Sequence, residues 1–517
     1  MKQKIVWIVP ALLVLLGIVL LFVRNFEDVT EPPDSDWSRP LELGETVTSD
    51  SPAVSSATNG AKIAYLTEEG VKQTGYDQEY SSTEETNIDI PVDKFTSIAT
   101  PGNQLVYSDY HQLFTEKKEK ISDLDTFLPL QNEVIFTKGT DVYVYEEDGS
   151  LTSILTLPDE KAEVLTYENH DGTYLATRIT ESSGNHLTFY HLKDGTLEKV
   201  READIPLQSG EELKEMHFAA AENDIRLIQS TLQKQSMTGK KKQLHYYAAF
   251  PAEEEASAPK MSRVTFSDPV TGKSLEELSD IELTVRGDKS LLLFKALGKT
   301  DTMFNKETQF NIYQAQVKEK GVNRVTRISN TPSPSLTPQW IDSHSIIWLD
   351  KKGDHYEVLL ASDEKAVISK TDGISSGNLL QAGGKTAGML SFGMLIVPIS
   401  LVWIIWPLVF LTILMFTKTK AMDEDRAWVF YTGAVIYLAA VFLFKGPVFS
   451  EQLLARTPDY LNFSGSTFIY LLAFALIAYV LVRAFHRVKD WSPFIQLSYF
   501  IGVHVAFITV FFGPYLL

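Results

Sequence analysis

The chain reads EVIFTKGTDVYVYEEDG from Glu133 to Gly149. An apolar run opens this stretch, and a second segment follows in which valine and tyrosine alternate. Both patterns are typical of β-strands. The closing pair Asp148-Gly149 supplies the positive φ angles that a type I′ hairpin turn requires. The stretch therefore predicts two neighbouring strands followed by a tight turn.

The same pattern recurs through the polar middle of the chain, residues 59–373. Asp-Gly pairs predict further turns at Asp171-Gly172, Asp194-Gly195 and Asp372-Gly373. Seven apolar runs stand at about the same place relative to a preceding turn: residues 62–66, 104–107, 133–136, 173–176, 224–228, 290–294 and 345–348. A four-stranded propeller blade takes about 40–45 residues, so this block has room for roughly seven blades. We expect an all-β propeller over residues 61–373.

One repeat carries a family resemblance. Pro334-Ser335-Leu336-Thr337-Pro338-Gln339-Trp340-Ile341-Asp342 leads into the apolar strand that starts at Ser345. This segment resembles the repeat of the TolB-type extracytoplasmic β-propellers, in which a Pro-Trp-Ser-Pro-Asp-Gly-like turn runs into a strand of the Ile-Ala-Phe kind. The resemblance covers about three-fifths of the chain and implies a fold. It implies no function, because such propellers serve as docking platforms, lids and sensors alike.

The N-terminal stretch Ile5 to Val23 carries no charge and is long enough to cross a membrane as a helix. Lys2 and Lys4 precede it, which favours a cytoplasmic N-terminus. A cleavable signal peptide would end in a small-x-small site, whereas this run ends in Phe22-Val23-Arg24-Asn25-Phe26. We therefore expect an uncleaved anchor helix within residues 1–26.

Four further apolar stretches predict a transmembrane domain over residues 389–517. They cover residues 389–416, 428–444, 467–482 and 494–512. The loops after the first and third of these stretches are basic and are therefore expected in the cytoplasm. Five crossings then place the propeller and the C-terminus outside the cytoplasm. The sequence predicts a multi-pass protein of a bacterial cytoplasmic membrane.

Two connecting segments are expected to lack regular structure. Residues 27–60 are rich in Asp, Glu, Ser, Thr and Pro and predict a flexible acidic tether. Residues 374–388 predict a linker of small residues. Gly373-Ile374-Ser375-Ser376-Gly377 matches the G-x-S-x-G pattern of serine hydrolases, but no α/β domain with later Asp and His partners follows it. We interpret this motif as part of the linker.

Composition excludes several classes of protein. The whole chain has a net charge of −19. Residues 26–385 have a net charge of −24, and the two flanking segments are slightly positive. An acidic middle segment disfavours binding to nucleic acid. The chain has no Cys, so disulfides, thiolate metal sites and Cys nucleophiles are excluded. It also lacks a P-loop and a His-Glu-x-x-His motif. We expect no cofactor, no metal and no catalytic residues.

A few residues are candidates for function. Lys240, Lys241 and Lys242 are expected at the tip of a hairpin, and with Trp340 they are the candidate binding residues of the propeller. His504 is the ionisable residue near the middle of a predicted span. We expect it to be packed, with a hydrogen bond to Ser498 or Thr509 on its own helix or to a neighbouring group.

Three functions are compatible with this pattern. The first is a non-enzymatic membrane protein whose propeller is a binding platform, either for an extracytoplasmic or membrane protein partner or for an envelope ligand. The second is a permease or channel subunit, with the propeller as receptor or lid. The third is a propeller-type hydrolase, for which the sequence offers no compact acid-base group.

Overall fold

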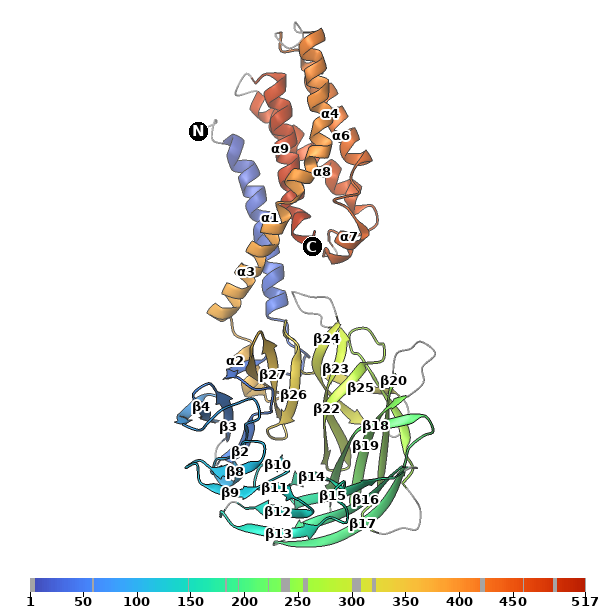
Figure 1. The fold of residues 1–517 in the computed structure, drawn as a ribbon. Coiled ribbons are helices and arrows are strands. Elements are labelled where there is room, and N and C mark those ends of the chain that lie inside the picture. Colours follow the sequence, from blue (N-terminus) through green and yellow to red (C-terminus); the bar gives the residue numbers. More distant parts are fainter. Residues whose placement is uncertain are drawn as a thin grey trace. The chain divides into compact units, whose positions relative to one another are not determined.

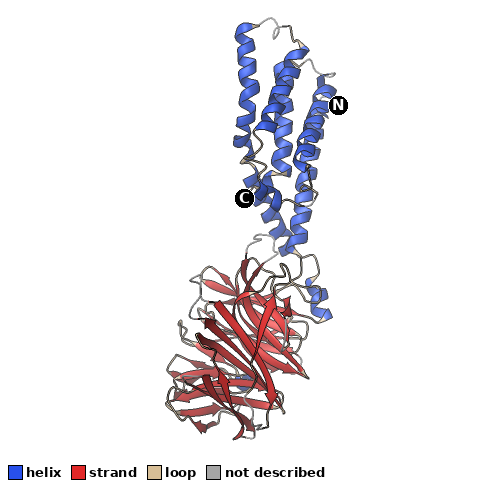
Figure 2. Ribbon diagram, turned by 90° about the vertical axis from the view of Figure 1, so that its right-hand side faces the viewer, coloured by secondary structure: helices blue, strands red, loops and turns tan. Residues whose placement is uncertain are grey.

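The computed structural model describes residues 5–57, 60–146, 148–181, 184–193, 195–221, 223–233, 242–253, 259–299, 308–318, 322–418, 424–458, 460–486 and 491–516. The chain divides into two compact units. Met1–Thr30 and Ile374–Leu517 form one, which we call the helical unit, and Glu31–Gly373 form the other, the β unit. Figure 2 shows that the β unit is built mainly of strands and the loops that join them.

Among the described residues, the β unit contains five four-stranded sheets, and strands that follow one another in the chain build four of these sheets (Figure 1). Four of them are β2–β5, β6–β9, β10–β13 and β14–β17, each in sequence order. Their strands are β2 (Ala53–Ala57), β3 (Gly60–Thr67), β4 (Gly70–Tyr76), β5 (Ser82–Ile88), β6 (Ser97–Ala99), β7 (Val106–Ser108), β8 (Gln112–Thr115), β9 (Lys120–Asp123), β10 (Thr126–Pro129), β11 (Val134–Lys138), β12 (Asp141–Tyr145), β13 (Leu151–Thr156), β14 (Glu163–Asn169), β15 (Gly172–Thr180), β16 (Gly184–Lys193) and β17 (Thr196–Pro206).

The fifth four-stranded sheet joins the two ends of the β unit. It consists of β26 (Ser335–Trp340), β27 (Ser345–Lys352), β28 (His355–Ser362) and, next to β28, the N-terminal strand β1 (Leu41–Thr46). Leu41 pairs with Leu360 in this antiparallel ladder. The Ser38 N–H extends the pairing by donating to the Ser362 carbonyl at 2.9 Å. The first and last strands of the β unit are therefore hydrogen-bonded to each other.

The remaining sheet has eight strands in the order β18-β19-β20-β21-β25-β24-β23-β22. Its members are β18 (Glu211–Ala221), β19 (Asp224–Gln233), β20 (Lys242–Pro251), β21 (Ser262–Ser267), β22 (Glu276–Arg286), β23 (Lys289–Lys299), β24 (Thr308–Val317) and β25 (Val322–Arg327). Each half is antiparallel, and β21 and β25 join the halves through a short parallel pairing, Thr265–Ser267 with Val322–Arg324. The structure thus shows six sheets, whereas the sequence predicts about seven separate blades.

The seven apolar runs predicted from the sequence occupy equivalent strands, namely β3, β7, β11, β15, β19, β23 and β27. Each is the second strand of a consecutive set of four. A strand in this position has a hydrogen-bonded partner on either side, so the central residues of these strands are mostly buried. In β11, for example, Val134, Ile135 and Phe136 are fully buried, and they contribute to two different clusters between neighbouring sheets.

The predicted acidic tether, residues 27–60, is largely ordered, and this prediction is wrong. Helix α1 (Ile5–Val29) extends into it, and the strands β1 and β2 lie within it. Trp37 is 5% exposed and packs in a cluster with Trp348. The segment holds few apolar residues, but pairing with β28 and the anchoring of Trp37 supply the stabilisation that its composition lacks.

The prediction of a linker over residues 374–388 is also wrong, because most of this segment is helical. Helix α3 (Ser376–Gly393) begins at its N-cap Ser375, whose side chain accepts a hydrogen bond from the Asn378 N–H at 3.0 Å. The hydroxyl of the G-x-S-x-G motif is thus used for capping. Asp372-Gly373 is not a hairpin turn either, since Asp372 is the C-cap of the short helix α2 (Lys365–Thr371).

In the described part of the helical unit, α1 and α3 are joined by five more helices. These are α4 (Ile396–Thr417), α6 (Ala427–Leu443), α7 (Glu451–Arg456), α8 (Ser466–His486) and α9 (Pro493–Phe511), followed by the 3₁₀ turn η2 (Gly513–Tyr515). Four described segments are helical, long and apolar enough to cross a membrane: Ile8–Val29, Ser376–Thr417, Ser466–Ala484 and Pro493–Phe511. Helix α6 is apolar but shorter, with 17 residues.

Polar contacts tie α1 to α3. The Lys385 ammonium, 6% exposed, lies 2.9 Å from the Asp28 carboxylate, and the Asn25 amide donates to the Thr386 hydroxyl at 2.9 Å. Because Asp28 also accepts from Arg24 at 3.3 Å, its charge is shared between two cations. These contacts give a physical reason why the small-residue segment forms a helix.

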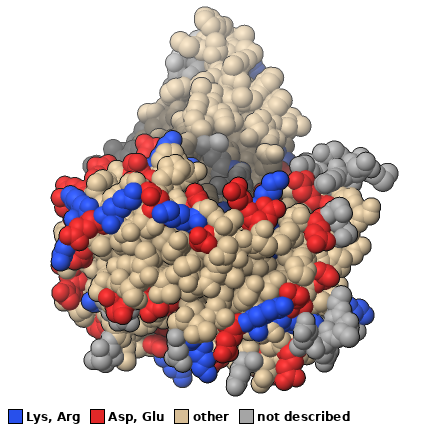
Figure 3. All heavy atoms as spheres, turned by 60° about the horizontal axis from the view of Figure 1, so that its bottom comes forward, with Lys and Arg blue, Asp and Glu red and all other residues tan. Residues whose placement is uncertain are grey.

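Charged side chains are distributed differently in the two units. Figure 3 shows acidic and basic side chains interspersed over the visible face of the β unit, and very few on the visible part of the helical unit. Many helical residues that are apolar are also exposed, including Leu12, Leu16, Leu401 and Ile405. Exposed apolar helix faces of this extent are expected where lipid replaces water.

Candidate functional site

A cleft of about 320 Å³ lies between the sheet β14–β17 and the strands β18 and β19 of the eight-stranded sheet. Its volume falls at the lower end of the range for small-molecule sites, roughly 300–1,000 Å³. Twelve residues line it: Asp171, Tyr174, Phe189, His191, Lys193, Glu198, Val200, Phe218, Ala220, Ala221, Ile225 and Ala252. The cleft combines apolar and aromatic side chains with three charged ones, as binding sites usually do.

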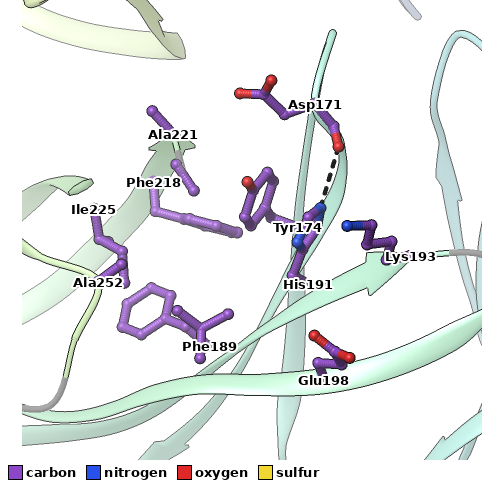
Figure 4. A pocket seen from close by; sticks show the side chains of 12 residues that line it. Asp171, Tyr174, Phe189, His191, Lys193, Glu198, Phe218, Ala221, Ile225 and Ala252 are labelled. Carbon is purple, nitrogen blue, oxygen red and sulfur yellow. Dashed lines mark hydrogen bonds between the residues drawn. The ribbon is translucent and has the colours of Figure 1, made fainter. Parts of the chain in front are cut away.

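Tyr174 and His191 form an aromatic stack in this cleft (Figure 4). They are directly opposite each other on β15 and β16, and their rings are 4.3 Å apart at an interplanar angle of 4°. The His191 Nε2 lies 3.2 Å from the Asp171 carbonyl oxygen. A carbonyl only accepts hydrogen bonds, so Nε2 carries the proton and the ring orientation is set.

The turn before β15 makes room for this ring. Gly172 has φ +130°, and a Cβ at this position would meet the His191 Nε2 at 3.0 Å. Asn169 pairs with Gly172, so the two turn residues are His170 and Asp171. The predicted turn is therefore present one residue earlier than its Asp-Gly pair suggests, and glycine is needed for the close approach of a side chain.

The apolar wall of the cleft joins Phe189, which lies on the same face of its sheet as Tyr174 and His191, to residues beyond that sheet (Figure 4). Phe189 and Phe218 meet edge to face with ring centroids 5.5 Å apart. Ile225 and Ala252 complete this wall and are 1% and 6% exposed. Small side chains at Ala252 and at the hairpin end of β18 keep the cleft from being filled.

Three charged side chains stand beside the aromatic stack. Asp171 lies at the β14–β15 turn, Lys193 ends β16, and Glu198 lies on β17 directly opposite His191. Within the described part of the chain, Lys193 and Glu198 have no ion-pair partner, and Asp171 lies 3.2 Å from the exposed His170. These side chains are therefore available to a charged ligand.

Of the predicted binding residues, Trp340 is buried. It ends β26 with 7% of its surface exposed, and the Arg286 guanidinium lies over its ring at 4.0 Å. Its backbone N–H donates to the Glu282 carboxylate at 2.9 Å. Burial raises the pKa of Glu282 to about 7, against the opposing effects of this hydrogen bond and of Arg286. Trp340 thus belongs to the packing between β22 and β26 and offers no surface to a partner.

The predicted lysine cluster is only partly visible. Lys240 and Lys241 lie outside the described residues. Lys242 is exposed at the start of β20, where it pairs with Gln233. It therefore remains accessible, but it does not line the cleft.

His504 is fully buried in the helical unit and makes two hydrogen bonds. Its Nε2 lies 3.0 Å from the Leu471 carbonyl of α8, and its Nδ1 lies 2.8 Å from the Tyr437 hydroxyl of α6. Because the carbonyl only accepts, Nε2 carries a proton. Nδ1 then accepts from Tyr437 in the neutral ring. The partners are on neighbouring helices, whereas Ser498 and Thr509 do not provide them.

Acidic and histidine side chains were compared for metal-binding geometry. Among the described residues, Glu42, Glu45 and Glu357 are close enough to share an ion. Two of these side chains are exposed, and Glu357 is paired with Lys352. His186 bonds to Asp204 at 2.7 Å, so it is not brought together with His191 of the cleft. These groups give no specific argument for a metal.

The cleft was not predicted from the sequence. Its residues come from five strands and two adjoining segments, and no local motif links them. The sequence does show the aromatic residues Tyr174 and His191, but whether their rings meet depends on the register between β15 and β16. Only the register places the two rings opposite each other.

No protein-family model matches this chain, and no curated protein matches it. Among solved structures, virginiamycin B lyase from Staphylococcus aureus is similar at 12% identity, with 63% of this chain and 99% of that chain covered and a TM-score of 0.36. TolB from Acinetobacter baumannii is 9% identical, with 60% and 79% covered and a TM-score of 0.28. Drosophila plexin A, solved with semaphorin 1b, is 8% identical, with 63% and 87% covered and a TM-score of 0.32. These β-propeller-like proteins include an enzyme and proteins that are not enzymes, so they leave catalysis in this chain undecided.

Proposed function

We propose that this chain is a non-enzymatic integral membrane protein whose β unit is a β-propeller that binds a partner outside the cytoplasm. The observation that carries the proposal is the pairing of β1 with β28. It holds the two ends of the β unit in one sheet, and the sequence continues from both ends into apolar helices. A closed β domain with two membrane connections is suited to present a fixed surface.

The proposal includes seven blades. The eight-stranded sheet consists of two antiparallel sets, β18–β21 and β22–β25, that are joined by a three-residue parallel pairing. If each set is one blade, the β unit has seven sets of four strands, and the last set is completed by β1. This arrangement is the closure by which propellers protect their sheet edges.

The proposed orientation rests on charge. Lys418 and Arg426 flank the loop between α4 and α6, and Arg483 lies near the end of α8, so these regions face the cytoplasm under the positive-inside rule. With an N-terminus inside and α6 as a short fifth span, residues 31–373 lie outside. The protein then belongs to a bacterial cytoplasmic membrane.

Binding is favoured over transport by the state of His504. Both of its ring nitrogens are engaged by Tyr437 and Leu471, so neither is available to a passing ion or proton without breaking a hydrogen bond. The described residues that line the cleft include no Ser, Thr or Cys, so the cleft offers no nucleophile of the serine- or cysteine-hydrolase kind.

The proposal is tested by photocrosslinking in intact cells. A photoreactive amino acid is placed in turn at Glu198 beside the cleft and at exposed Lys242, and the full-length protein is recovered for mass spectrometry. Exposed Lys289, the first residue of β23, is the matched control. We expect one defined protein adduct at Glu198 or Lys242 that is absent at Lys289. Equal labelling at Glu198, Lys242 and Lys289 would reject the platform. A fourth variant carries the photoreactive group at His504, and labelling of that position alone by a small solute would replace the platform by a transport function.

A further inference from the structure

At one end of the helical unit, α4 ends, α6 begins and α8 is close to its last turn. The described basic residues there include Lys418, Arg426 and Arg483. Arg426 is paired, because its Nη2 lies 2.6 Å from the Glu424 carboxylate. In the described part of the chain, Lys418 and Arg483 have no carboxylate within ion-pair distance. Two cations of this end are therefore available to an anion.

Three aromatic rings hold the Arg483 guanidinium in place. Its central carbon lies 4.9 Å from the centroid of the Tyr431 ring, 5.5 Å from that of Tyr479 and 6.0 Å from that of Phe430. Its Nε donates to the Tyr479 hydroxyl at 3.2 Å. Such contacts with ring faces attract the cation but leave its charge uncompensated. The two Nη groups donate to no other described residue, so they keep their N–H donors for a ligand.

Both cations stand beside one exposed face of α6. Trp428, Tyr431 and Val435 are exposed, and their spacing of three and four residues places them on the same side of the helix. Lys418 is the C-cap of α4, and its Nζ lies 6.0 Å from the centroid of the Trp428 ring. Arg483 reaches Tyr431 from α8. Two neighbouring helices thus bring a positive charge to the aromatic end of this face.

The apolar surface beyond the cations indicates what kind of anion fits. Leu476 and Val480 are exposed on α8, and their spacing to Arg483 places all three residues on one face. Helix α8 is long and apolar enough to cross a membrane. A ligand with an anionic head and long apolar chains can therefore contact the cations and the apolar faces together. A free phosphate would leave the apolar side chains uncovered.

We propose that Lys418 and Arg483 bind the headgroup of an acidic phospholipid. Trp428 and Tyr431 lie at the level of its glycerol group, where such side chains are enriched in membrane proteins, and the acyl chains follow Val435 on α6 and the exposed face of α8. Basic pockets between transmembrane helices bind acidic headgroups in this way. A zwitterionic lipid fits less well, because its own cationic group would lie beside the two protein cations.

The test uses the full-length protein in detergent and native mass spectrometry, which resolves each bound lipid by its mass. Phosphatidylglycerol and phosphatidylcholine with identical acyl chains are titrated separately, and glycerophosphoglycerol supplies the acidic headgroup without chains. One basic residue near an anionic headgroup contributes about fivefold in affinity, so two should give a preference of at least tenfold for phosphatidylglycerol. Equal affinity for the two lipids would overturn the proposal. Binding of glycerophosphoglycerol as tight as that of the lipid would overturn it too, because it would assign the site to a soluble anion.

Two variants locate the lipid. Lys418→Gln and Arg483→Gln should each lower the preference for phosphatidylglycerol about fivefold. Lys445→Gln is the matched control, because Lys445 follows the opposite end of α6 and lies 3.6 Å from the centroid of the Phe468 ring, so it is also a cation above an aromatic ring. The control should keep the full preference. A preference that falls equally in Lys418→Gln and Lys445→Gln, or in neither of them, would refute the proposal.

Folding of the variants is checked by their Tm in nanodiscs of phosphatidylcholine. Lys418 is exposed, so Lys418→Gln should keep the wild-type Tm there, and its comparison with Lys445→Gln decides the question even where Arg483→Gln is unstable. In nanodiscs that contain phosphatidylglycerol, the wild type should gain more in Tm than Lys418→Gln, since a ligand stabilises the folded state that binds it. Equal gains in Tm would contradict the site. This inference is independent of the binding platform, because its test changes no residue of the β unit.

Discussion

Replacing Asp350 by Asn should remove a pH dependence from the stability of the β unit. Asp350 lies on β27 and is 1% exposed. Its Oδ1 accepts from the Ser335 hydroxyl at 2.7 Å and from the Trp348 indole N–H at 3.0 Å. Burial raises the pKa of this carboxyl from 3.8 to about 6, although the hydrogen bonds, including one with Thr331, act in the opposite direction.

The sign of the effect follows from proton linkage. Between pH 4 and pH 6 the folded protein holds a proton on Asp350 that the unfolded chain has lost, so the free energy of unfolding falls as pH rises through this window. A difference of about 2 in pKa corresponds to about 3 kcal/mol, since each pKa unit is worth about 1.36 kcal/mol. Above pH 6 Asp350 is ionised in both the folded and the unfolded state, so the folded state bears the full free-energy cost of burying its charge.

Asn keeps the hydrogen bonds of Asp350 without the charge. The amide oxygen of the substituted residue accepts from Ser335 and Trp348, and its NH₂ faces Thr331. Asp350→Asn should therefore have nearly the wild-type stability at pH 4 and be more stable at pH 8 by up to about 3 kcal/mol. For a unit of this size this corresponds to a Tm increase of about 4 °C, from the usual entropy of unfolding per residue.

The assay is thermal unfolding of the full-length protein in nanodiscs, followed by circular dichroism in the β region at pH 4, 5, 6, 7 and 8. The difference between variant and wild type cancels the titration of other groups, such as Glu282, whose pKa is also raised. Parallel Tm curves for the two proteins would refute the reasoning, because they would show that Asp350 has the same pKa in the folded and unfolded states.

Three further predictions concern packing. His504→Ala should destabilise the helical unit by about 2–4 kcal/mol, since it leaves a cavity and removes two hydrogen bonds. Tyr437→Phe removes one of these hydrogen bonds and should cost about 1 kcal/mol. Equal losses of unfolding free energy for the two variants in detergent would contradict this view of the site. Lys385→Met should lower the free energy of unfolding by about 1–3 kcal/mol, because it leaves Asp28 with one cation. Adding Asp28→Asn should restore part of this loss. A double variant whose loss of stability equals the sum of the two single losses would show that the pair is not coupled. Gly172→Ala should lower the Tm, because φ is +130° and a Cβ would press on the His191 ring; an unchanged Tm would contradict this prediction.

The periodic parts of both units could be predicted from the sequence. The apolar runs at residues 133–136 and 345–348, for example, are the buried second strands β11 and β27. Burial on both faces demands a continuous apolar run, so the pattern is local and visible in one dimension. The apolar helices are visible for the same reason, since a helix that faces lipid is apolar over most of its length.

The elements that were missed depend on distant partners. Residues 41–46 look like a polar tether, yet they form β1 because β28 offers a free edge more than three hundred residues later. Residues 374–388 look like a flexible linker, yet residues 376–388 form most of α3, which packs beside α1. In both cases the local composition is weak, and the stabilisation comes from a contact that no sequence window contains.

The sequence by itself determined the β-rich middle, the apolar helices around it and the absence of cysteine chemistry, because each of these follows from residue type and short-range periodicity. Tertiary structure alone decided the cleft, the burial of Trp340 and the partners of His504. These depend on strand register and on which helices are neighbours, and a shift of one residue in the pairing of β15 with β16 would separate the Tyr174 and His191 rings.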